Sequence, residues 1–214
     1  VFTSSATVYG NPNHLPVDEN HTLNPVNPYG VSKYLIEELI KKWTSSKREN
    51  TSLILRCFNP IGAHESGLLG ESPRNKLTNL LPIIANVAFS NTGVLKIFGN
   101  NYQTKDGTCE RDFVCISDIA RAHLLASELS DKLGTCEIIN IGSGISTSVL
   151  ELVNIFENVI GKKINKSYEN VRNGDVASIY ADNKKAEKLL NWKALYECKH
   201  GCETFWNWKK KSNG

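Results

Sequence analysis

The feature that most constrains the fold of this sequence is the near-continuous apolar run at residues 53–58. Such a run is typical of a strand that is buried on both faces of a parallel sheet. Before it come a strand end at residues 1–5 and a helix over residues 28–47, for which Asn27 is a suitable N-cap. Strand, helix and strand in this order form a right-handed crossover unit. The sequence therefore predicts an α/β fold.

The rest of the chain continues this alternation. Further helices are expected near residues 80–89, 118–129, 149–160, 183–190 and 200–210, and further strands at residues 94–98, 112–116, 137–141, 164–168 and 178–181. Ser117 is the expected N-cap of the helix at 118–129, and Ser148 and Glu151 form a capping box for the next one. Residues 59–76 and 100–110 are expected to be loops. The apolar face of the first helix is formed by Leu35, Ile36, Leu39, Ile40 and Trp43.

The composition argues against several function classes. The net charge of +3 is too small to indicate binding to nucleic acid or to a membrane surface. No apolar run approaches the roughly 18 residues of a membrane-spanning helix. The six cysteines form no C-x-x-C pair and the histidines lack zinc-ligand spacing, so we expect no metal site. Reduced cysteines are expected, in a cytoplasmic protein.

The start of the sequence is unusual for a complete domain. The chain contains no Met, and residues 1–5 have the character of the end of a buried strand. A domain rarely begins within a strand. We therefore expect that further sequence precedes this chain.

The strongest chemical signal is the pair Tyr29 and Lys33 at the start of the first helix. Residues four apart share one helix face, and a nearby ammonium stabilises the phenolate form of tyrosine. Tyr29 is therefore a candidate general base. From this spacing alone, an ordinary surface tyrosine beside a solvated lysine remains the alternative. The preceding strand ends at Ser4 and Ser5, and ligands of open α/β sheets bind at such strand ends. A serine hydroxyl at this strand end, facing Tyr29 and Lys33 on the next helix, would complete a Ser–Tyr–Lys triad.

With this triad the sequence resembles the extended short-chain dehydrogenase/reductase superfamily, and within it the UDP-galactose/UDP-glucose 4-epimerases. The resemblance covers nearly the whole chain, and its two long blocks make it far more specific than Tyr29 and Lys33 alone. The matching stretches are SSATVYG from Ser4, NPYGVSK from Asn27, LRCFNPIGAHESGLLGE from Leu55, NLLP from Asn79, IFGNNYQTKDGTCERDFV from Ile97, NIGSG from Asn140 and RNGD from Arg172.

The resemblance implies an incomplete NAD-binding Rossmann-type doubly wound sheet plus a smaller α/β substrate-binding domain. Residues 1–62 would be the remainder of the NAD-binding domain, and residues 63–214 mainly the UDP-sugar domain, with about 112–130 returning to the first. The implied reaction is the interconversion of UDP-galactose and UDP-glucose through a transient 4-keto sugar, with bound NAD. A homodimer packed through the Tyr29 helix is implied as well. The present chain alone is expected to be inactive.

Residue roles follow from the same resemblance. Ser5 and Tyr29 would contact the sugar 4-hydroxyl, and Lys33 would hold the nicotinamide ribose. Ser4 and Phe58 would lie on the nicotinamide side. Asn59, Arg111 and Arg172 would hold the phosphates. Asp175 would hold the ribose, and Ile179 would lie at the sugar. The full set of substrate-binding positions would be Asn59, Asn79, Leu80, Lys96, Ile97, Phe98, Arg111, Arg172, Asp175 and Ile179. Arginine guanidinium groups do match phosphate oxygens, although either arginine alone also fits a surface salt bridge.

Two other functions stay open. A nucleotide-sugar dehydratase or decarboxylase belongs to the same superfamily, but the dehydratases are expected to carry an acidic pair where this chain has Ala6 and Thr7. A non-catalytic UDP-sugar-binding module is the other, and the intact triad argues against it.

One departure from many relatives is Cys57, which stands where they carry an aromatic residue. The Gly142-Ser-Gly144 stretch lacks a third glycine and is interpreted as a turn.

Overall fold

The computed structural model describes residues 1–72, 77–90, 93–129 and 136–212. Its largest sheet is parallel and has the strand order β1-β2-β7, formed by β1 (Phe2–Ser5), β2 (Ser52–Cys57) and β7 (Cys136–Ile141). All six residues of β2 are buried, as the apolar run predicts. The predicted α/β fold with a parallel sheet is thus confirmed.

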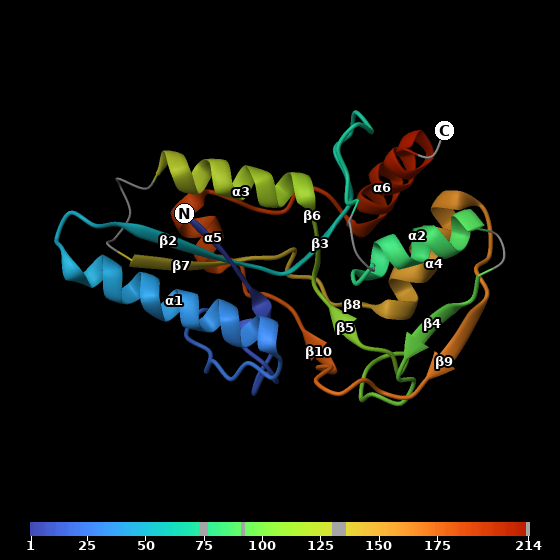
Figure 1. Cartoon of the computed structure of the whole chain (residues 1–214), viewed down its shortest axis with the longest axis horizontal. Coiled ribbons are helices and arrows are strands. Elements are labelled where there is room, and N and C mark those ends of the chain that lie inside the picture. The colour runs from blue at the N-terminus through green and yellow to red at the C-terminus, as the bar shows by residue number, and fades with distance from the viewer. Residues whose placement is uncertain (73–76, 91–92, 130–135, 213–214) are drawn as a thin grey trace.

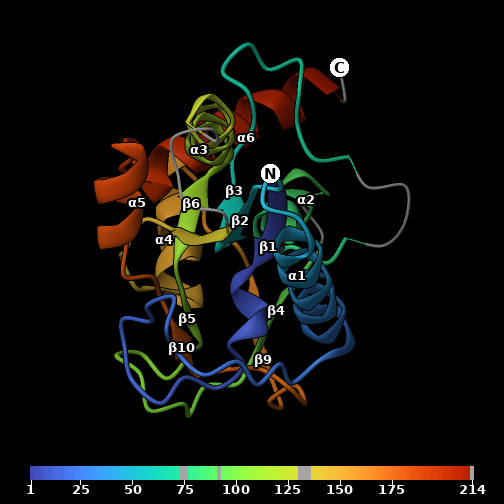
Figure 2. The ribbon, with the colours of Figure 1, turned by 90° about the vertical axis from the view of Figure 1, so that its left-hand side faces the viewer.

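Helices cover both faces of this sheet. Helix α1 (Pro28–Ser46) lies on one face, and α3 (Ile116–Glu128) and α5 (Lys184–Leu190) lie on the other, as Figures 1 and 2 show from two sides. A one-turn 3-10 helix, Ala6–Val8, follows β1 and leads the chain away from the sheet edge. The sheet therefore has the doubly wound arrangement in which ligands bind beyond the carboxyl ends of the strands.

A second group of elements lies beside the sheet, to the right in Figure 1. In the described part of the chain, its strands form three small sheets. These are β3 (Asn59–Ile61) with β6 (Phe113–Cys115), β4 (Leu95–Phe98) with β9 (Lys166–Glu169), and β5 (Glu110–Arg111) between β8 (Thr147–Ser148) and β10 (Ser178–Ile179). Its helices are α2 (Leu80–Ser90), α4 (Val149–Ile160) and α6 (Cys198–Ser212). Among the described residues, no helix is both long enough and apolar enough to cross a membrane.

Each group has its own hydrophobic core. The core of the large sheet includes Leu55, Ile139 and Trp192, and the core of the second group includes Phe156 and Phe205. The chain passes from the first core to the second directly after β2. The segment after β2 is therefore anchored in both cores, by Phe58 in the first and by Ile61 in the second. Strand β7 pairs with β2, and helix α5 packs into the core of the large sheet. The division of the chain into residues 1–62 and 63–214 stays a prediction.

Several local predictions were wrong. Residues 59–61 were expected in a loop but form β3, and Glu110, also expected in a loop, belongs to β5. Helix α3 begins at Ile116 with Cys115 as N-cap, and no side chain caps it, so Ser117 is not the cap. These strands have only two or three residues, and their pairing partners lie far away in sequence, so no local periodicity marks them. Residues 73–76 of the expected long loop lie outside the described residues.

The expected caps of two helices are confirmed. The Asn27 side chain accepts a hydrogen bond from the Gly30 amide, 2.8 Å away. Ser148 and Glu151 form the predicted capping box of α4, and Gly161 ends that helix with φ of 67°. Both signals are local, because a cap needs only residues within one helical turn.

The apolar face of α1 is not buried against the sheet. Leu35, Leu39 and Trp43 are 55%, 65% and 55% exposed, whereas the buried residues of the helix are Gly30, Glu37 and Thr44. The helix thus turns a partly polar face toward the strands and leaves its apolar face to solvent. Such an exposed apolar face is typical of an interaction surface.

Helix α4 carries the buried carboxylate of Glu157. Burial alone would raise the pKa of Glu157, but hydrogen bonds from Lys163 (2.7 Å) and Lys166 outweigh it and lower the pKa to about 2. A carboxylate whose pKa falls on folding stabilises the protein above its unfolded pKa, and this contribution is lost as the pH falls toward the folded pKa.

We expect Glu157→Gln to lower the free energy of unfolding by about 3 kcal/mol at pH 7. This deficit should shrink by roughly 1 kcal/mol at pH 3.5, where part of the carboxylate contribution is already lost. Urea unfolding of both proteins at the two pH values measures it. Glu203→Gln, in an exposed pair with Lys199, is the control and should change little. A deficit of the same size at both pH values would contradict the role of the Glu157 charge.

Candidate active site

A cavity of about 520 Å³ opens beyond the carboxyl ends of β1 and β2. We call it the Tyr29 cavity, because Tyr29 on the first turn of α1 lines it. Its wall includes Ser5 at the end of β1, Phe58 directly after β2 and Ile179 from β10. The predicted site residues that line it are Ser5, Tyr29, Phe58, Asn59, Asn79, Arg111, Asp175 and Ile179. Residues spread over most of the chain thus meet in one place.

A second cavity, of about 740 Å³, lies among β4, β5 and α2, and we call it the Phe98 cavity. The predicted site residues that line it are Asn59, Asn79, Leu80, Lys96, Ile97, Phe98, Arg111, Arg172 and Asp175. Asn59, Asn79, Arg111 and Asp175 line both cavities. Because they share these residues, the two cavities adjoin and can hold two parts of one ligand.

The Ser–Tyr–Lys triad has a defined geometry. Lys33 lies one helical turn after Tyr29, with its Nζ atom 5.6 Å from the centre of the Tyr29 ring, and it donates a hydrogen bond to the Thr3 carbonyl at 2.9 Å. The Ser5 hydroxyl oxygen accepts hydrogen bonds from the Thr7 amide at 3.3 Å and the Thr7 hydroxyl at 3.0 Å. Its own O–H therefore remains able to donate to a ligand.

Close packing of α1 against the segment after β1 depends on Gly30. A Cβ atom at this position would lie 2.7 Å from the Thr7 carbonyl oxygen, which is closer than real Cβ contacts. The missing side chain lets the first turn of α1 approach Thr7, and so brings Tyr29 close to the end of β1. We interpret Gly30 as the residue that permits the triad geometry.

Two arginine side chains line the Phe98 cavity, and Arg111 lines the Tyr29 cavity as well. Arg111 donates from Nη1 to the carbonyl oxygens of Glu110 (2.8 Å) and Val176 (2.6 Å), and its Nη2 atom lies 4.0 Å from the Asp175 carboxylate. The Arg172 guanidinium stacks on Phe98, with 3.5 Å between Cζ and the ring centre. Two guanidinium groups in one cavity favour a ligand with phosphate groups.

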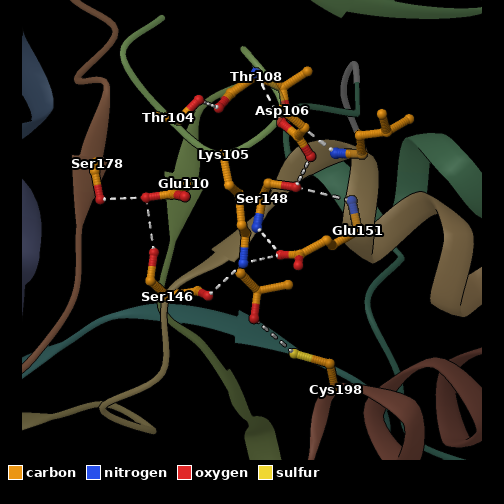
Figure 3. Close-up of polar contacts among 12 residues, drawn as sticks. Thr104, Lys105, Asp106, Thr108, Glu110, Ser146, Ser148, Glu151, Ser178 and Cys198 are labelled. Atoms are coloured by element: carbon orange, nitrogen blue, oxygen red, sulfur yellow. Dashed lines mark hydrogen bonds and ion pairs between the residues drawn. The ribbon is translucent and has the colours of Figure 1, made fainter.

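A network of polar side chains holds the strand that carries Arg111, and Figure 3 shows it from close by. The Glu110 carboxylate accepts hydrogen bonds from Ser146 (3.0 Å) and Ser178 (2.9 Å), and so connects β5 to the segments on both sides. Asp106 accepts hydrogen bonds from Thr108 and Ser148. Burial would raise the pKa of Asp106, but these bonds outweigh it and lower the pKa. Hydrogen bonds from the neighbouring segments therefore hold the strand that carries Arg111.

The family model described as GDP-mannose 4,6 dehydratase matches residues 1–205. The chain belongs to this family. Among curated relatives, it is 44% identical to a UDP-glucose 4-epimerase of Cyamopsis tetragonoloba and 43% identical to that of Homo sapiens, in both cases over 99% of this chain. The chain spans about 61% of the length of these relatives.

Solved structures of the same enzyme class have the same fold. The UDP-glucose 4-epimerase from Bifidobacterium longum, in complex with NAD+ and UDP, is 38% identical with a TM-score of 0.93, over 99% of this chain and 63% of that one. The enzyme from Stenotrophomonas maltophila, with bound NAD and formylated UDP-arabinopyranose, is 37% identical with a TM-score of 0.95, over the same shares. Similarity of this degree covers both groups of elements.

Not every predicted residue lines a cavity. Ser4 is buried, and its hydroxyl donates to Glu37, so its side chain points away from the ligand space. Lys33 is not among the residues that line the Tyr29 cavity, although its Nζ atom lies 5.6 Å from the centre of the Tyr29 ring. Cys57 does line the Tyr29 cavity, and burial raises the pKa of its thiol to about 12, so it is a neutral wall residue.

Sequence reasoning also missed residues of the walls. Thr7, Asn27 and Val176 line the Tyr29 cavity, and Thr78 lines both cavities. Each stands within two residues of a predicted site residue. Adjacency to a predicted residue was therefore a usable signal, because a wall that is built from loops exposes several neighbouring positions.

Proposed function

We propose that the protein interconverts UDP-galactose and UDP-glucose by inversion at the sugar 4-position. The observation that carries this proposal is the junction of the two cavities. A sugar in the Tyr29 cavity and a nucleotide in the Phe98 cavity can belong to one molecule, with its diphosphate at Arg111 and Arg172. The Asp175 carboxylate accepts hydrogen bonds, which suits the hydroxyl groups of a ribose.

In this proposal the triad handles the proton of the sugar 4-hydroxyl. Tyr29, as the phenolate, takes the proton, and the Lys33 ammonium stabilises that negative charge. The Ser5 O–H donates to the same sugar oxygen and orients it. Arg111 and Arg172 hold the diphosphate, so that the sugar stays in the Tyr29 cavity while it turns over.

The residues around the Tyr29 cavity fit the nicotinamide end of NAD. Phe58 offers a flat apolar surface there, and Lys33 has ammonium protons left for a ribose hydroxyl after its bond to Thr3. When bound, NAD would supply the reversible hydride acceptor for the 4-carbon of the sugar. No G-x-G-x-x-G stretch, which receives the other end of a dinucleotide, occurs among these 214 residues. We propose that a further segment provides it, and that the chain alone does not turn over the substrate.

The description of the family names a dehydratase, but the wall of the Tyr29 cavity favours the epimerase. After Ser5, where an acidic pair would move protons in a dehydratase, this chain has Ala6 and Thr7. The Thr7 hydroxyl bonds to Ser5. Among the described residues of that wall, Asp175 is the one acidic side chain, and it faces Arg111. A non-catalytic binding module would not need the triad.

The decisive experiment uses the whole protein, with the further segment that relatives of full length carry. UDP-galactose is supplied, and formation of UDP-glucose is followed by a coupled dehydrogenase assay. Bound NAD is released by denaturation and quantified. Conversion with stoichiometric NAD supports the proposal. Loss of water to give a 4-keto-6-deoxy sugar, or UDP-sugar binding without turnover, would replace it with one of the two alternatives.

We also propose a cytoplasmic location and a role in galactose metabolism. All six cysteines of the chain carry free thiols, which is typical of proteins in a reducing compartment. The proposed substrates are intermediates of sugar metabolism. Location by fluorescent tagging of the whole protein tests the first point.

The exposed apolar face of α1 supports a homodimer, which we propose as the working form. Leu35, Leu39 and Trp43 lie on this face, together with the 40%-exposed Val31. A second copy would bury them in a symmetric interface.

We expect Leu39→Glu to raise the dimer dissociation constant about 30-fold or more, because it buries an unpaired charge. Sedimentation equilibrium measures the constant. Leu124→Glu, at an exposed position of α3, is the control, and equal effects of both variants would argue against α1 as the interface.

A further inference from the structure

Helix α1 carries a charged residue on the face that packs against the sheet. Glu37 is fully buried, and it follows Tyr29 by eight positions and Lys33 by four. Residues four apart lie on one face of a helix. The three side chains therefore form a row along α1. A buried carboxylate is costly unless it is paired and hydrogen-bonded, so the environment of Glu37 has to compensate its charge.

Arg56 of β2 and Ser4 of β1 provide this compensation. The Arg56 Nη2 atom donates to Glu37 Oε2 at 2.7 Å, and its Nε atom donates to Oε1 at 3.1 Å. The Ser4 hydroxyl donates to the same Oε1 atom at 2.5 Å. Arg56 and Ser4 are 1% and 2% exposed. A bidentate pair of this kind fixes direction as well as distance.

The remaining donors of Arg56 extend the connection across the sheet. Its Nη1 atom donates to the Tyr9 hydroxyl at 3.0 Å and to the Glu19 carbonyl at 3.2 Å. Burial raises the pKa of Tyr9 to about 12, so Tyr9 stays protonated. Its hydroxyl donates a hydrogen bond to the Asn140 side chain at 2.6 Å. Helix α1 is thereby connected through Arg56 and Tyr9 to β2 and β7.

These contacts adjoin the residues that line the cavity. Ser4 directly precedes Ser5, and Arg56 directly precedes Cys57, which lines the cavity. One turn before Glu37, Lys33 is bonded to the Thr3 carbonyl. Two successive turns of α1 are thus attached to two successive residues of β1. Apolar side chains would permit the helix to slide or rotate slightly, whereas these directional bonds do not.

We infer that the Glu37–Arg56 pair is a positioning pair for catalysis: it sets the rotation and height of α1 on β1, so that Tyr29 and Ser5 address the same sugar hydroxyl. The inference rests on the proposed function, in which Tyr29 is the base. Stability alone does not explain the pair, because a buried ion pair can often be replaced by apolar residues without loss of stability. A role in positioning predicts that such a replacement keeps the fold and lowers turnover.

The test compares two variants in the whole protein. Glu37→Leu combined with Arg56→Met removes both charges and keeps similar volumes. We expect it to fold, to keep KM for UDP-galactose within about 3-fold, and to lower kcat about 100-fold, since small misplacements of catalytic groups have effects of this size. Glu37→Gln keeps the side-chain shape but weakens the bidentate bond, and kcat should fall about 10-fold. In both, the pH profile of kcat should move to higher pH, because Lys33 is less well placed beside Tyr29.

Two controls separate positioning from general damage. Glu38→Gln removes a half-exposed ion pair with Lys41 on the same helix and should leave kcat and its pH profile unchanged. Glu157→Gln removes a buried carboxylate far along the chain and should lower stability without moving the pH profile. If the double variant fails to fold, Glu37→Gln decides. An unchanged kcat and pH profile in a folded Glu37 variant would overturn the inference.

Tyr29→Phe is measured in parallel to keep this inference apart from the proposed function. If Tyr29→Phe is as active as the unchanged protein, the proposed base is wrong, whatever the Glu37 variants do. If Tyr29→Phe is inactive but the Glu37 variants keep their kcat, the positioning pair alone is wrong.

Discussion

Tyr29→Phe in the whole protein is expected to lower kcat for UDP-galactose by about 10²–10⁴-fold, the usual contribution of a general base. The substitution removes the hydroxyl that exchanges the proton and keeps the ring that lines the cavity. Affinity for the UDP-sugar should change far less. In the proposed complex, affinity comes from the arginines and aromatic ring at the Phe98 cavity, which Tyr29 does not line.

Initial rates over a range of UDP-galactose concentrations give kcat and KM, and calorimetric titration with UDP gives the affinity of the nucleotide part. Tyr34→Phe is a matched control, because it removes a hydroxyl from the same helix at a position outside both cavity walls. It should leave kcat within a factor of a few. A Tyr29→Phe protein with nearly normal kcat would place the base elsewhere.

The sequence predicted the parts of the fold that depend on neighbouring residues. The Asn27 cap, the Ser148–Glu151 capping box and the buried strand β2 all have signals within a few positions. The short strands β5 and β8 were missed because their signals are not local. Glu110 of β5 pairs with Ser148 of β8, far along the chain, and a strand of two residues shows no periodicity.

The inward face of α1 shows a different limit of sequence reasoning. Hydrophobic periodicity identified the stripe with Leu39 and Trp43 as the apolar face, and a helix normally buries such a face. The helix instead buries Glu37, because Arg56 and Ser4 compensate its charge. Position 37 continues the four-residue spacing from Tyr29 and Lys33, so it was visible as part of the row. That Arg56 is its partner follows only from the packing of α1 on the sheet.

The candidate site was predicted by resemblance far more than by physical reasoning. Spacing alone singled out Tyr29 and Lys33, but nothing local connects them with Arg111 or Ile179. The structure brings most of the predicted residues to the two adjoining cavities. It also gives two details that no motif contains: the stacking of Arg172 on Phe98, and the engagement of Ser4 with Glu37.

We propose that Ile179 limits the size of the sugar that the Tyr29 cavity accepts. It is 7% exposed, lines the Tyr29 cavity and pairs with Arg111 across β10 and β5. The resemblance associates large aromatic residues here with simple hexoses and small residues with N-acetylated hexosamines. The physical reason is volume, because the intermediate has to turn over within the cavity and an N-acetyl group sweeps additional space. Isoleucine is smaller than tyrosine and larger than alanine.

We therefore expect efficient conversion of UDP-galactose and weak conversion of UDP-N-acetylgalactosamine by the whole protein. Overfilling a packed site costs about 1–3 kcal/mol, which corresponds to roughly 5- to 150-fold in rate. Ile179→Ala should raise kcat/KM for the N-acetylated substrate by a factor in this range relative to UDP-galactose. Ile179→Tyr should remove the remaining N-acetyl activity while it keeps that on UDP-galactose.

The ratio of kcat/KM for the two substrates is the measurement, because it cancels losses that affect both. Ile179→Ala also removes a buried side chain and is expected to destabilise the protein by about 2–5 kcal/mol. Such a loss reduces the amount of active protein equally for both substrates and leaves the ratio unchanged. If the ratio is the same for isoleucine, alanine and tyrosine at position 179, Ile179 is a buried strand residue without a role in sugar choice. A graded ratio in the order of side-chain volume would assign the choice of sugar to this one position.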